Sequence, residues 1–425
     1  MPRRAEAALS SDLRHRVVTI PIDDPGDLIE RLPDPRGTAW VRRSEGLVGW
    51  GIAASWEMTG EERFSRAQRW WSEWCRKADV EDPLLIPGSG PVAFASFTFD
   101  PDPQSGAPSC VIVPRVVLGR RDGRAWLTVV DPVNEPPLLP TTVTPVSVPP
   151  PPGDVEWSQG SQSAEQWQEA VAEVIRRINS GEVDKVVLAR DVEARVRDLD
   201  ARYLLRRLAQ DYPECWTFSV EGLVGATPEL LVRRTGDLVV SRVLAGTVKR
   251  RGDETVDDSL AAALLGSGKD LEEHEYAVHS VARALAAHCT DLSVPTRPHV
   301  LRLANVQHLA TDVTGSLADD APVLALAAAL HPTAAVCGTP TERAFAMIRE
   351  LEGMDRGRYA GPVGWFDSRG DGEFGIALRC AEVSAEGLRL FAGCGIVAGS
   401  DPDSELAESR AKFVPIRDAL DSPPS

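Results

Sequence analysis

The chain has 425 residues, of which 43% are hydrophobic and 26% are charged, and its formal net charge is −17 at pH 7. This composition is ordinary for a globular protein, and the length suits two or three average domains or one large fold. The acidic balance argues against nucleic acid or an anionic membrane as a partner, because both attract basic surfaces. If the protein binds an anionic metabolite, the site must supply its own arginines, lysines, backbone amides or metal ion.

The sequence lacks the apolar runs of membrane and secreted proteins. No stretch of eighteen apolar residues occurs, and the arginine-containing N-terminus has no apolar core of the kind found in signal peptides. The seven cysteines are scattered singly, without a CxxC pair. Single cysteines are typical of reduced thiols and not of a disulfide framework or a structural zinc site. We therefore expect a cytoplasmic protein that does not enter membranes.

Strand-like runs and one helix occupy the first third of the chain. Asp122-Gly123 is a strong hairpin turn between two β-prone runs. A charged, tryptophan-rich stretch at residues 60–79 predicts a helix. The predicted strands lie at residues 46–54, 92–99, 111–118 and 125–130.

A proline-rich stretch follows this first part. Nine prolines fall between residues 132 and 152, and the last four are consecutive. Such a stretch forms neither a regular helix nor a central strand, so an extended connector is expected at residues 136–155. We therefore expect an N-terminal part at 1–135 that contributes strands to the sheets, and a catalytic part at 156–425.

The signals for secondary structure are sharper after the connector. Ser163 and Gln166 form a capping box ahead of apolar residues at helical spacing, and Gly181 ends that helix. Strands in runs, mixed with helices, indicate an α+β or mixed α/β protein built on large sheets. The further predicted helices lie at residues 269–288 and 323–330, and the predicted strands at 184–190, 216–220, 230–233, 238–243, 375–383 and 388–397.

The last predicted helix carries a charged pattern. Glu405 and Glu408 are three residues apart and Lys412 follows four residues later, which places all three on one side of a helix just after a glycine-rich turn. Two carboxylates suit a hard divalent cation, and a lysine beside glycines suits an anionic substrate. An ordinary Glu–Lys pair on a solvated helix face is the other interpretation.

Three further charged residues allow a structural or a chemical interpretation. Lys185 starts a hydrophobic strand, where its ammonium either reaches solvent or is desolvated and acts as a base. Glu229 follows Pro228 and is either a turn residue facing water or a carboxylic acid at a site. Glu273 complements a helix dipole, or it points inward along a helical stripe and needs a cation. Without a Cys/His cluster, the expected metal is Mg²⁺.

Two small-residue segments and three other side chains complete the candidates. Residues 244–247 and 393–395 are expected to be loops that present amides to a carboxylate, or else tight turns. Arg379 is expected in the middle of a strand, where a buried guanidinium needs an anion such as a substrate carboxylate. His308 and His331 are isolated histidines with a structural or a functional role.

Nine segments, in unbroken order between residues 163 and 413, together resemble the chorismate-utilising enzymes and most closely the isochorismate synthases. The segments are DKVVLAR, GATPELLVRR, LAGT, KDLEEH, VQHLAT, HPTAAVCGTP, RYAGPVGW, GEFGIALRC and GCGIVAGSDPDSELAES. The resemblance implies a single large chorismate-binding α+β fold with two packed, mainly antiparallel β-sheets flanked by helices.

The resemblance also implies a role for each candidate. Lys185 would activate water for attack at C2 of chorismate, and Glu229 would protonate the departing C4 hydroxyl. Glu273 and Glu408 would hold Mg²⁺, with Glu405 close by through water. The residues implied in substrate binding are Gly246, Thr247, His308, Ala335, Tyr359, Arg379, Gly393 and Lys412.

Relatives within this family perform different reactions. Those that add ammonia typically carry glutamine at the position of Lys185, so lysine favours water as the nucleophile. Salicylate synthases, the alternative function, typically have threonine at the position of Ala335, so alanine favours stopping at isochorismate. A non-catalytic subunit paired with an amidotransferase would lack a catalytic carboxylate. We therefore expect an Mg²⁺-dependent isochorismate synthase that acts on chorismate as a monomer, without an amidotransferase partner.

Overall fold

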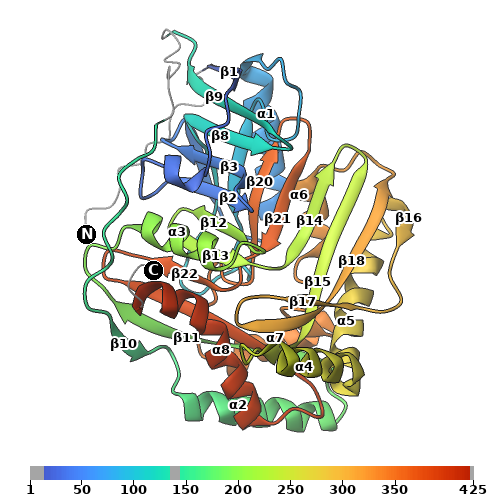
Figure 1. Ribbon diagram of the computed structural model, residues 1–425. Helices are drawn as coiled ribbons and strands as arrows, with labels where there is room; N and C mark the ends of the chain where they lie inside the picture. The colour runs from blue at the N-terminus through green and yellow to red at the C-terminus, as the bar shows by residue number, and fades with distance from the viewer. Residues whose placement is uncertain (1–13, 135–143, 422–425) are drawn as a thin grey trace.

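The structure is a computed structural model that describes residues 14–134 and 144–421. Two β-sheets form its centre (Figure 1). Within the described residues the larger sheet has thirteen strands, and β1 and β5 are its parallel pair. In spatial order the strands are β10 (Glu156–Gln159), β11 (Lys185–Arg195), β23 (Leu388–Ile396), β22 (Cys380–Val383), β13 (Leu223–Thr227), β12 (Trp216–Val220), β2 (Thr38–Arg42), β3 (Glu45–Trp50), β8 (Val116–Arg121), β9 (Arg124–Pro132), β1 (His15–Ile22) and β5 (Asp79–Glu81), with β19 (Gly338–Thr339) beside β11.

The second sheet has ten strands in the described part of the chain, and all its recorded pairs are antiparallel. In spatial order they are β16 (Cys289–Ser293), β18 (Val306–Leu317), β15 (Leu238–Lys249), β14 (Leu230–Thr235), β21 (Gly372–Ile376), β20 (Pro362–Asp367), β6 (Val92–Ser96), β7 (Ser109–Val113) and β4 (Ala54–Met58), with β17 (His299–Arg302) beside β18. The expectation of an α+β fold with two mainly antiparallel sheets is confirmed.

Helices cover the sheets and carry apolar faces toward them. The helices α5 and α6 pack on β14, β15 and β18, whereas α2, α3, α7 and α8 contact strands of the larger sheet. The helices are α1 (Arg63–Lys77), α2 (Ala164–Asn179), α3 (Ala201–Asp211), α4 (Glu254–Gly266), α5 (Gly268–Leu285), α6 (Val323–Leu330), α7 (Thr341–Leu351) and α8 (Pro402–Asp421), with a 3₁₀ turn at Ile29–Arg31. Ser163 and Gln166 form the predicted capping box of α2.

The chain passes from one sheet to the other at eight places in the described residues. Four of these crossings lie between β3 and β4, β7 and β8, β13 and β14, and β21 and β22. Three runs expected as single strands, 46–54, 111–118 and 375–383, are therefore each two strands in different sheets. The prediction of single strands was wrong because the apolar pattern continues across each break. The break lies at Gly51, where φ is +65°, in the first run and at Pro114 in the second.

Each sheet contains strands from both parts of the chain, in two blocks that meet at one strand pair. In the larger sheet β2 pairs with β12, and in the other sheet β6 pairs with β20. Residues 144–155 of the expected connector form neither helix nor strand, and 136–143 lie outside the described residues.

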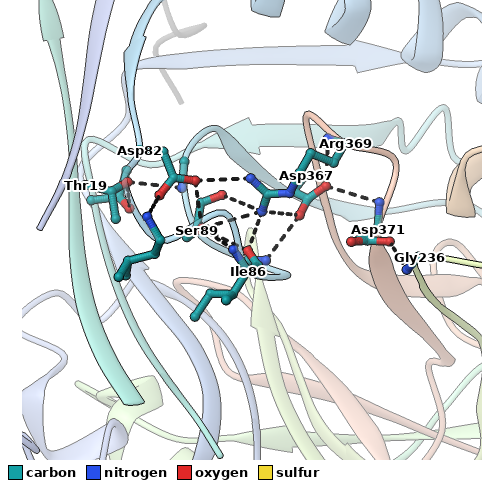
Figure 2. Close-up of polar contacts among 12 residues, drawn as sticks. Thr19, Asp82, Ile86, Ser89, Gly236, Asp367, Arg369 and Asp371 are labelled. Atoms are coloured by element: carbon teal, nitrogen blue, oxygen red, sulfur yellow. Dashed lines mark hydrogen bonds and ion pairs between the residues drawn. The ribbon is translucent and has the colours of Figure 1, made fainter. Parts of the chain in front are cut away.

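A buried polar network joins the loop at 82–90 to the turn between β20 and β21 (Figure 2). Arg369 lies between two carboxylates, with Nη1 3.1 Å from Asp82 Oδ2 and Nη2 3.0 Å from Asp367 Oδ2. Ser89 also donates to Asp82, and Gly236 donates its N–H to Asp371. Because both carboxylates are almost fully buried, this guanidinium fixes an N-terminal loop to a C-terminal turn.

No helix of the described residues is long and apolar enough to cross a membrane. All seven cysteines are free thiols, and six of them are buried.

Candidate active site

A cavity of about 60 Å³ lies beside the crossings β13–β14 and β21–β22. Its lining comes from strands of both sheets, from the helices α5 and α8, and from both crossings. Eleven of the thirteen residues expected in the site line it, namely Glu229, Gly246, Thr247, Glu273, His308, Ala335, Tyr359, Arg379, Gly393, Glu408 and Lys412. The two others, Lys185 and Glu405, lie beside members of this set.

Lys185 is the first residue of β11, and its side chain is completely buried. Its Nζ lies 3.2 Å from Glu273 Oε1, but it has no hydrogen-bond partner of good geometry in the described part of the chain. A Cβ on Gly395 would lie 3.0 Å from Lys185 Cε, so the lysine sits directly behind this glycine of the cavity wall. The side chain therefore does not reach solvent, so that interpretation of Lys185 is wrong, and its action as a base stays a prediction.

Glu229 lies at the crossing between β13 and β14 and is 4% exposed. Its backbone carbonyl accepts from the N–H of Ile376, which ties the first crossing to the strand that leads into the second. Burial raises the pKa of the Glu229 carboxyl to about 8, although the charges of Lys185 and Arg379 oppose this shift. Glu229 therefore holds a proton at neutral pH, and the water-facing turn residue is excluded.

Arg379 is not in the middle of a strand, as the sequence indicated. It lies between β21 and β22 with φ at +49°, because the chain changes sheets there. The side chain is buried, and its Nη2 lies 3.3 Å from His308 Nε2. A guanidinium can only donate, so Nε2 of His308 accepts and its Nδ1 carries the proton.

The protonated Nδ1 of His308 lies 3.0 Å from Thr247 Oγ1. Burial, together with the charges of Arg379 and Lys412, holds the pKa of His308 well below its usual range, so the ring is neutral. Since Thr247 Oγ1 accepts this proton, its own hydroxyl hydrogen remains to donate to a ligand. The β-bulge at Gly246, where φ is +77°, sets the direction of Thr247.

The segments at 244–247 and 393–395 are not loops, because they lie within β15 and β23. Gly393 accepts from Lys412 Nζ at 2.8 Å, and a Cβ on Gly393 would approach Tyr359 Oη to 3.0 Å. Burial raises the pKa of Tyr359 far above its usual range, so the phenol keeps its proton. These glycines keep the floor of the cavity open.

Three carboxylates on α5 and α8 each face one lysine. Glu273 faces Lys185, Glu405 Oε1 lies 2.9 Å from Lys269 Nζ, and Glu408 Oε1 lies 2.5 Å from Lys412 Nζ. Burial alone would lower the pKa of Lys412, but Glu408 outweighs it and raises that pKa. Glu405 and Glu408 are thus not charges on a solvated helix face.

Lys269 was not predicted, since no signal distinguishes it from a surface lysine at a helix start.

The donors at this end of the cavity suit a hard cation. Within the described residues, ligand atoms of Cys394, Glu405 and Glu408 lie within 4.8 Å of one another. Burial raises the pKa of the Cys394 thiol far above its usual range, so the sulfur stays protonated and the carboxylates are the available donors. A Cβ on Gly395 would lie 2.1 Å from Glu273 Oε1, so only glycine leaves room for that carboxylate. Oxygen donors of this kind fit Mg²⁺.

Nine residues of the lining are not among the thirteen expected site residues, and Arg356 and Val187 show why. Arg356 is buried, forms an ion pair with Glu352, and donates to the carbonyls of Val336 and Val187. It therefore joins β11 to the segment that holds Ala335, and this link gave no signal because the two carbonyls are distant from Arg356 in sequence. Val187, on β11, was missed because an apolar strand residue carries no functional signal. His331 lies outside this cavity.

Comparisons with known proteins agree with this geometry. The sequence profile of a family described as "Chorismate binding enzyme" matches residues 35–421. Isochorismate synthase DhbC of Bacillus subtilis (strain 168) is 43% identical over 262 residues, which is 59% of this chain and 66% of that protein. The salicylate biosynthesis isochorismate synthase of Pseudomonas aeruginosa is 33% identical over 405 residues, which is 90% of this chain and 84% of that protein.

Among solved structures, MenF, the menaquinone-specific isochorismate synthase from Escherichia coli, has a TM-score of 0.78 and 26% identity, covering 96% of this chain and 94% of that one. The profile match includes strands of both sheets and every residue of the cavity. The chain belongs to the family of chorismate-binding enzymes.

Proposed function

We propose that this chain is an isochorismate synthase, which adds water at C2 of chorismate and expels the C4 hydroxyl. The observation that carries the proposal is a buried, protonated carboxyl in the cavity lining, Glu229, together with a buried lysine directly behind the cavity wall, Lys185. Both the Bacillus subtilis and the Pseudomonas aeruginosa relatives are named as isochorismate synthases, which supports this choice of reaction.

In this reaction Lys185 is the general base and Glu229 the general acid. Lys185 takes a proton from the water whose oxygen forms the new bond to C2. Glu229 gives its proton to the C4 hydroxyl, which leaves as water when the C4–O bond breaks. One water enters and one leaves, and a proton returned from Lys185 to Glu229 restores both groups.

The substrate's carboxylates would be held by cationic and hydroxyl groups of the cavity. Arg379 and Lys412 supply positive charge, and Thr247 supplies a free hydroxyl hydrogen. These cations supply the local positive charge that an anionic substrate needs in a protein with a net charge of −17. The neutral His308 holds both Thr247 and Arg379 in position. Ala335 adds no polar side chain to the part of the cavity wall that it lines.

Glu273 and Glu408, with Glu405 beside them, would hold Mg²⁺. When bound, the cation would supply positive charge for a substrate carboxylate, and the three lysines now paired with these glutamates would be released from them. In particular, Lys185 would no longer face the carboxylate of Glu273. We also propose that the enzyme is a cytoplasmic monomer.

Product analysis tests the reaction and the metal together. Purified protein is incubated with chorismate, either with Mg²⁺ or with EDTA, and the products are separated by chromatography. We expect isochorismate with Mg²⁺ and almost none with EDTA. Salicylate and pyruvate as the main products would favour the salicylate synthase alternative, and no turnover under either condition would refute the proposal. Unchanged turnover in EDTA would remove the metal from it.

A further inference from the structure

Lys269 is the most accessible of the three lysines that face the carboxylates of the proposed metal site. The side chain of Lys269 is 38% exposed, whereas those of Lys412 and Lys185 are 12% and 0% exposed. Lys412 also donates to the carbonyl of Gly393. Lys269 has Glu405 as its one recorded hydrogen-bond partner in the described part of the chain. Of the three, Lys269 is therefore the one that can turn outward into water at little cost.

The position of Lys269 in its helix is unfavourable without a carboxylate partner. It is the second residue of α5, where unpaired backbone N–H groups form the positive end of the helix dipole. Glu405 lies in the first turn of α8, so the ion pair joins the starts of two helices. The distance from Nζ to Oε1 is 2.9 Å, and Glu405 is 3% exposed. The ammonium is therefore held in place by Glu405 and not by its own helix.

The ammonium of Lys269 also acts on the other two carboxylates of the proposed metal site. Lys269 and Glu273 are four residues apart on α5, a spacing that places two side chains on the same side of a helix. Burial alone would lower the pKa of Lys269, but nearby negative charges outweigh it and raise that pKa. In order of decreasing effect, these charges are Glu405, Glu273 and Glu408. One ammonium therefore offsets negative charge at all three carboxylates.

Lys269 and a divalent cation need the same carboxylate. Ligand atoms of Glu405 and Glu408 lie within 4.8 Å of each other, which is the arrangement that suits a metal ion. Lys269 contacts one oxygen of this pair, Oε1 of Glu405. Two cations that are drawn to one carboxylate repel each other, so the presence of one weakens the binding of the other.

We propose that Lys269 is an internal counter-ion that competes with Mg²⁺ for Glu405 and thereby lowers the affinity of the site for the metal. This inference rests on the metal site proposed above and adds to it a residue that sets its affinity. Without the metal, Lys269 compensates a buried carboxylate that would otherwise be costly. On metal binding the ammonium turns into water, which its exposure permits.

Isothermal titration calorimetry with MgCl₂ in the absence of chorismate tests the competition directly. The titration is run at a pH of about 8, so that protons do not compete for the carboxylates. Lys269→Met removes the ammonium and keeps a long side chain, and we expect it to lower the dissociation constant for Mg²⁺ at least about fivefold. Lys269→Arg keeps the charge and should bind Mg²⁺ like the wild type. The matched control is Lys249→Met, which removes one charge from the exposed end of β15 and should also bind like the wild type.

Melting temperatures give a second measurement that does not depend on turnover. In EDTA, Lys269→Met should melt below the wild type, because Glu405 is left buried without a counter-ion. Added Mg²⁺ should then raise its melting temperature more than that of the wild type, since tighter binding gives larger stabilisation. If Lys269→Met fails to fold by circular dichroism, Lys269→Gln decides in its place, because its amide can donate to Glu405 without carrying a charge.

Three results would overturn the inference, and only one of them would also refute the metal site. Equal or weaker Mg²⁺ binding by Lys269→Met would show that Lys269 holds Glu405 in position for the metal instead of competing with it. Binding by Lys269→Arg as tight as by Lys269→Met would show that charge is not the cause. No Mg²⁺ binding by either the wild type or Lys269→Met up to about 10 mM would refute the metal site itself. None of these measurements requires isochorismate to form, so they stay decisive if the proposed reaction alone is wrong.

Discussion

The carboxyl of Glu229 gives the proposed reaction a pH dependence with a definite sign. Burial raises its pKa to about 8, so the acid form that donates a proton predominates below that pH and disappears above it. We expect kcat/KM for chorismate to fall as pH rises through about 8. Glu229→Gln should lose about 10²–10⁴-fold in rate and should also lose this alkaline limb. A wild-type profile that is flat from pH 7 to about 10 would contradict the role.

Gly395 offers a substitution that separates function from stability. Its backbone is not in the left-handed region, so alanine is compatible with the chain, but the new Cβ would lie 2.1 Å from Glu273 Oε1. That oxygen ends a flexible side chain, so Glu273 can move aside at little cost to the fold. The new Cβ would also lie 3.0 Å from Lys185 Cε, which has to shift by a few tenths of an ångström. We expect Gly395→Ala to raise the Mg²⁺ concentration needed for half-maximal activity at least about tenfold. Its melting temperature should stay close to that of the wild type.

Gly399→Ala is the matched control for this experiment. A Cβ there meets nothing within 4 Å, so both activity and melting temperature should be unchanged. Full activity of Gly395→Ala at low Mg²⁺ would show that the position of Glu273 does not matter.

At the scale of single elements, the capping box of α2 allows a direct stability test. Ser163 Oγ accepts from the N–H of Gln166 at 3.2 Å, and the Gln166 side chain accepts from the N–H of Ser163 at 2.9 Å. Ser163→Ala removes the first of these bonds, and we expect the free energy of unfolding in urea to fall by about 1 kcal/mol. Ser163→Asp should restore most of it, and equal losses in both variants would contradict a capping role.

The elements themselves show what the sequence can and cannot specify. Helix α2, helix α6 and the hairpin at Asp122-Gly123 were predicted because caps, periodicity and turn residues are local signals. Residues 375–383 were predicted as one strand and are two, because an apolar run looks the same whether or not the chain leaves its sheet. Arg379 was misplaced for this reason, although its chemical role as a buried cation beside the cavity was inferred correctly.

In the candidate site, too, the sequence identified residues but not their contacts. The motifs located eleven cavity residues, but their pairing depends on contacts between distant segments. That Glu405 would face Lys269, that Glu273 would face Lys185, and that His308 would accept from Arg379 follow from tertiary packing alone. A sequence without its fold carries no signal for such pairs.

At the scale of the whole molecule, the sharing of each sheet between N-terminal and C-terminal strands makes the two parts of the chain dependent on each other. Without the N-terminal part, β12 would lose β2 and β20 would lose β6, so two central strands with buried residues would become open edges. We therefore expect a fragment of residues 154–425 to aggregate or to lack native near-ultraviolet circular dichroism. Mixing it during refolding with residues 1–134 should restore a soluble complex of native size by gel filtration. A monomeric, cooperatively unfolding 154–425 fragment would instead show that the catalytic part is an independent domain.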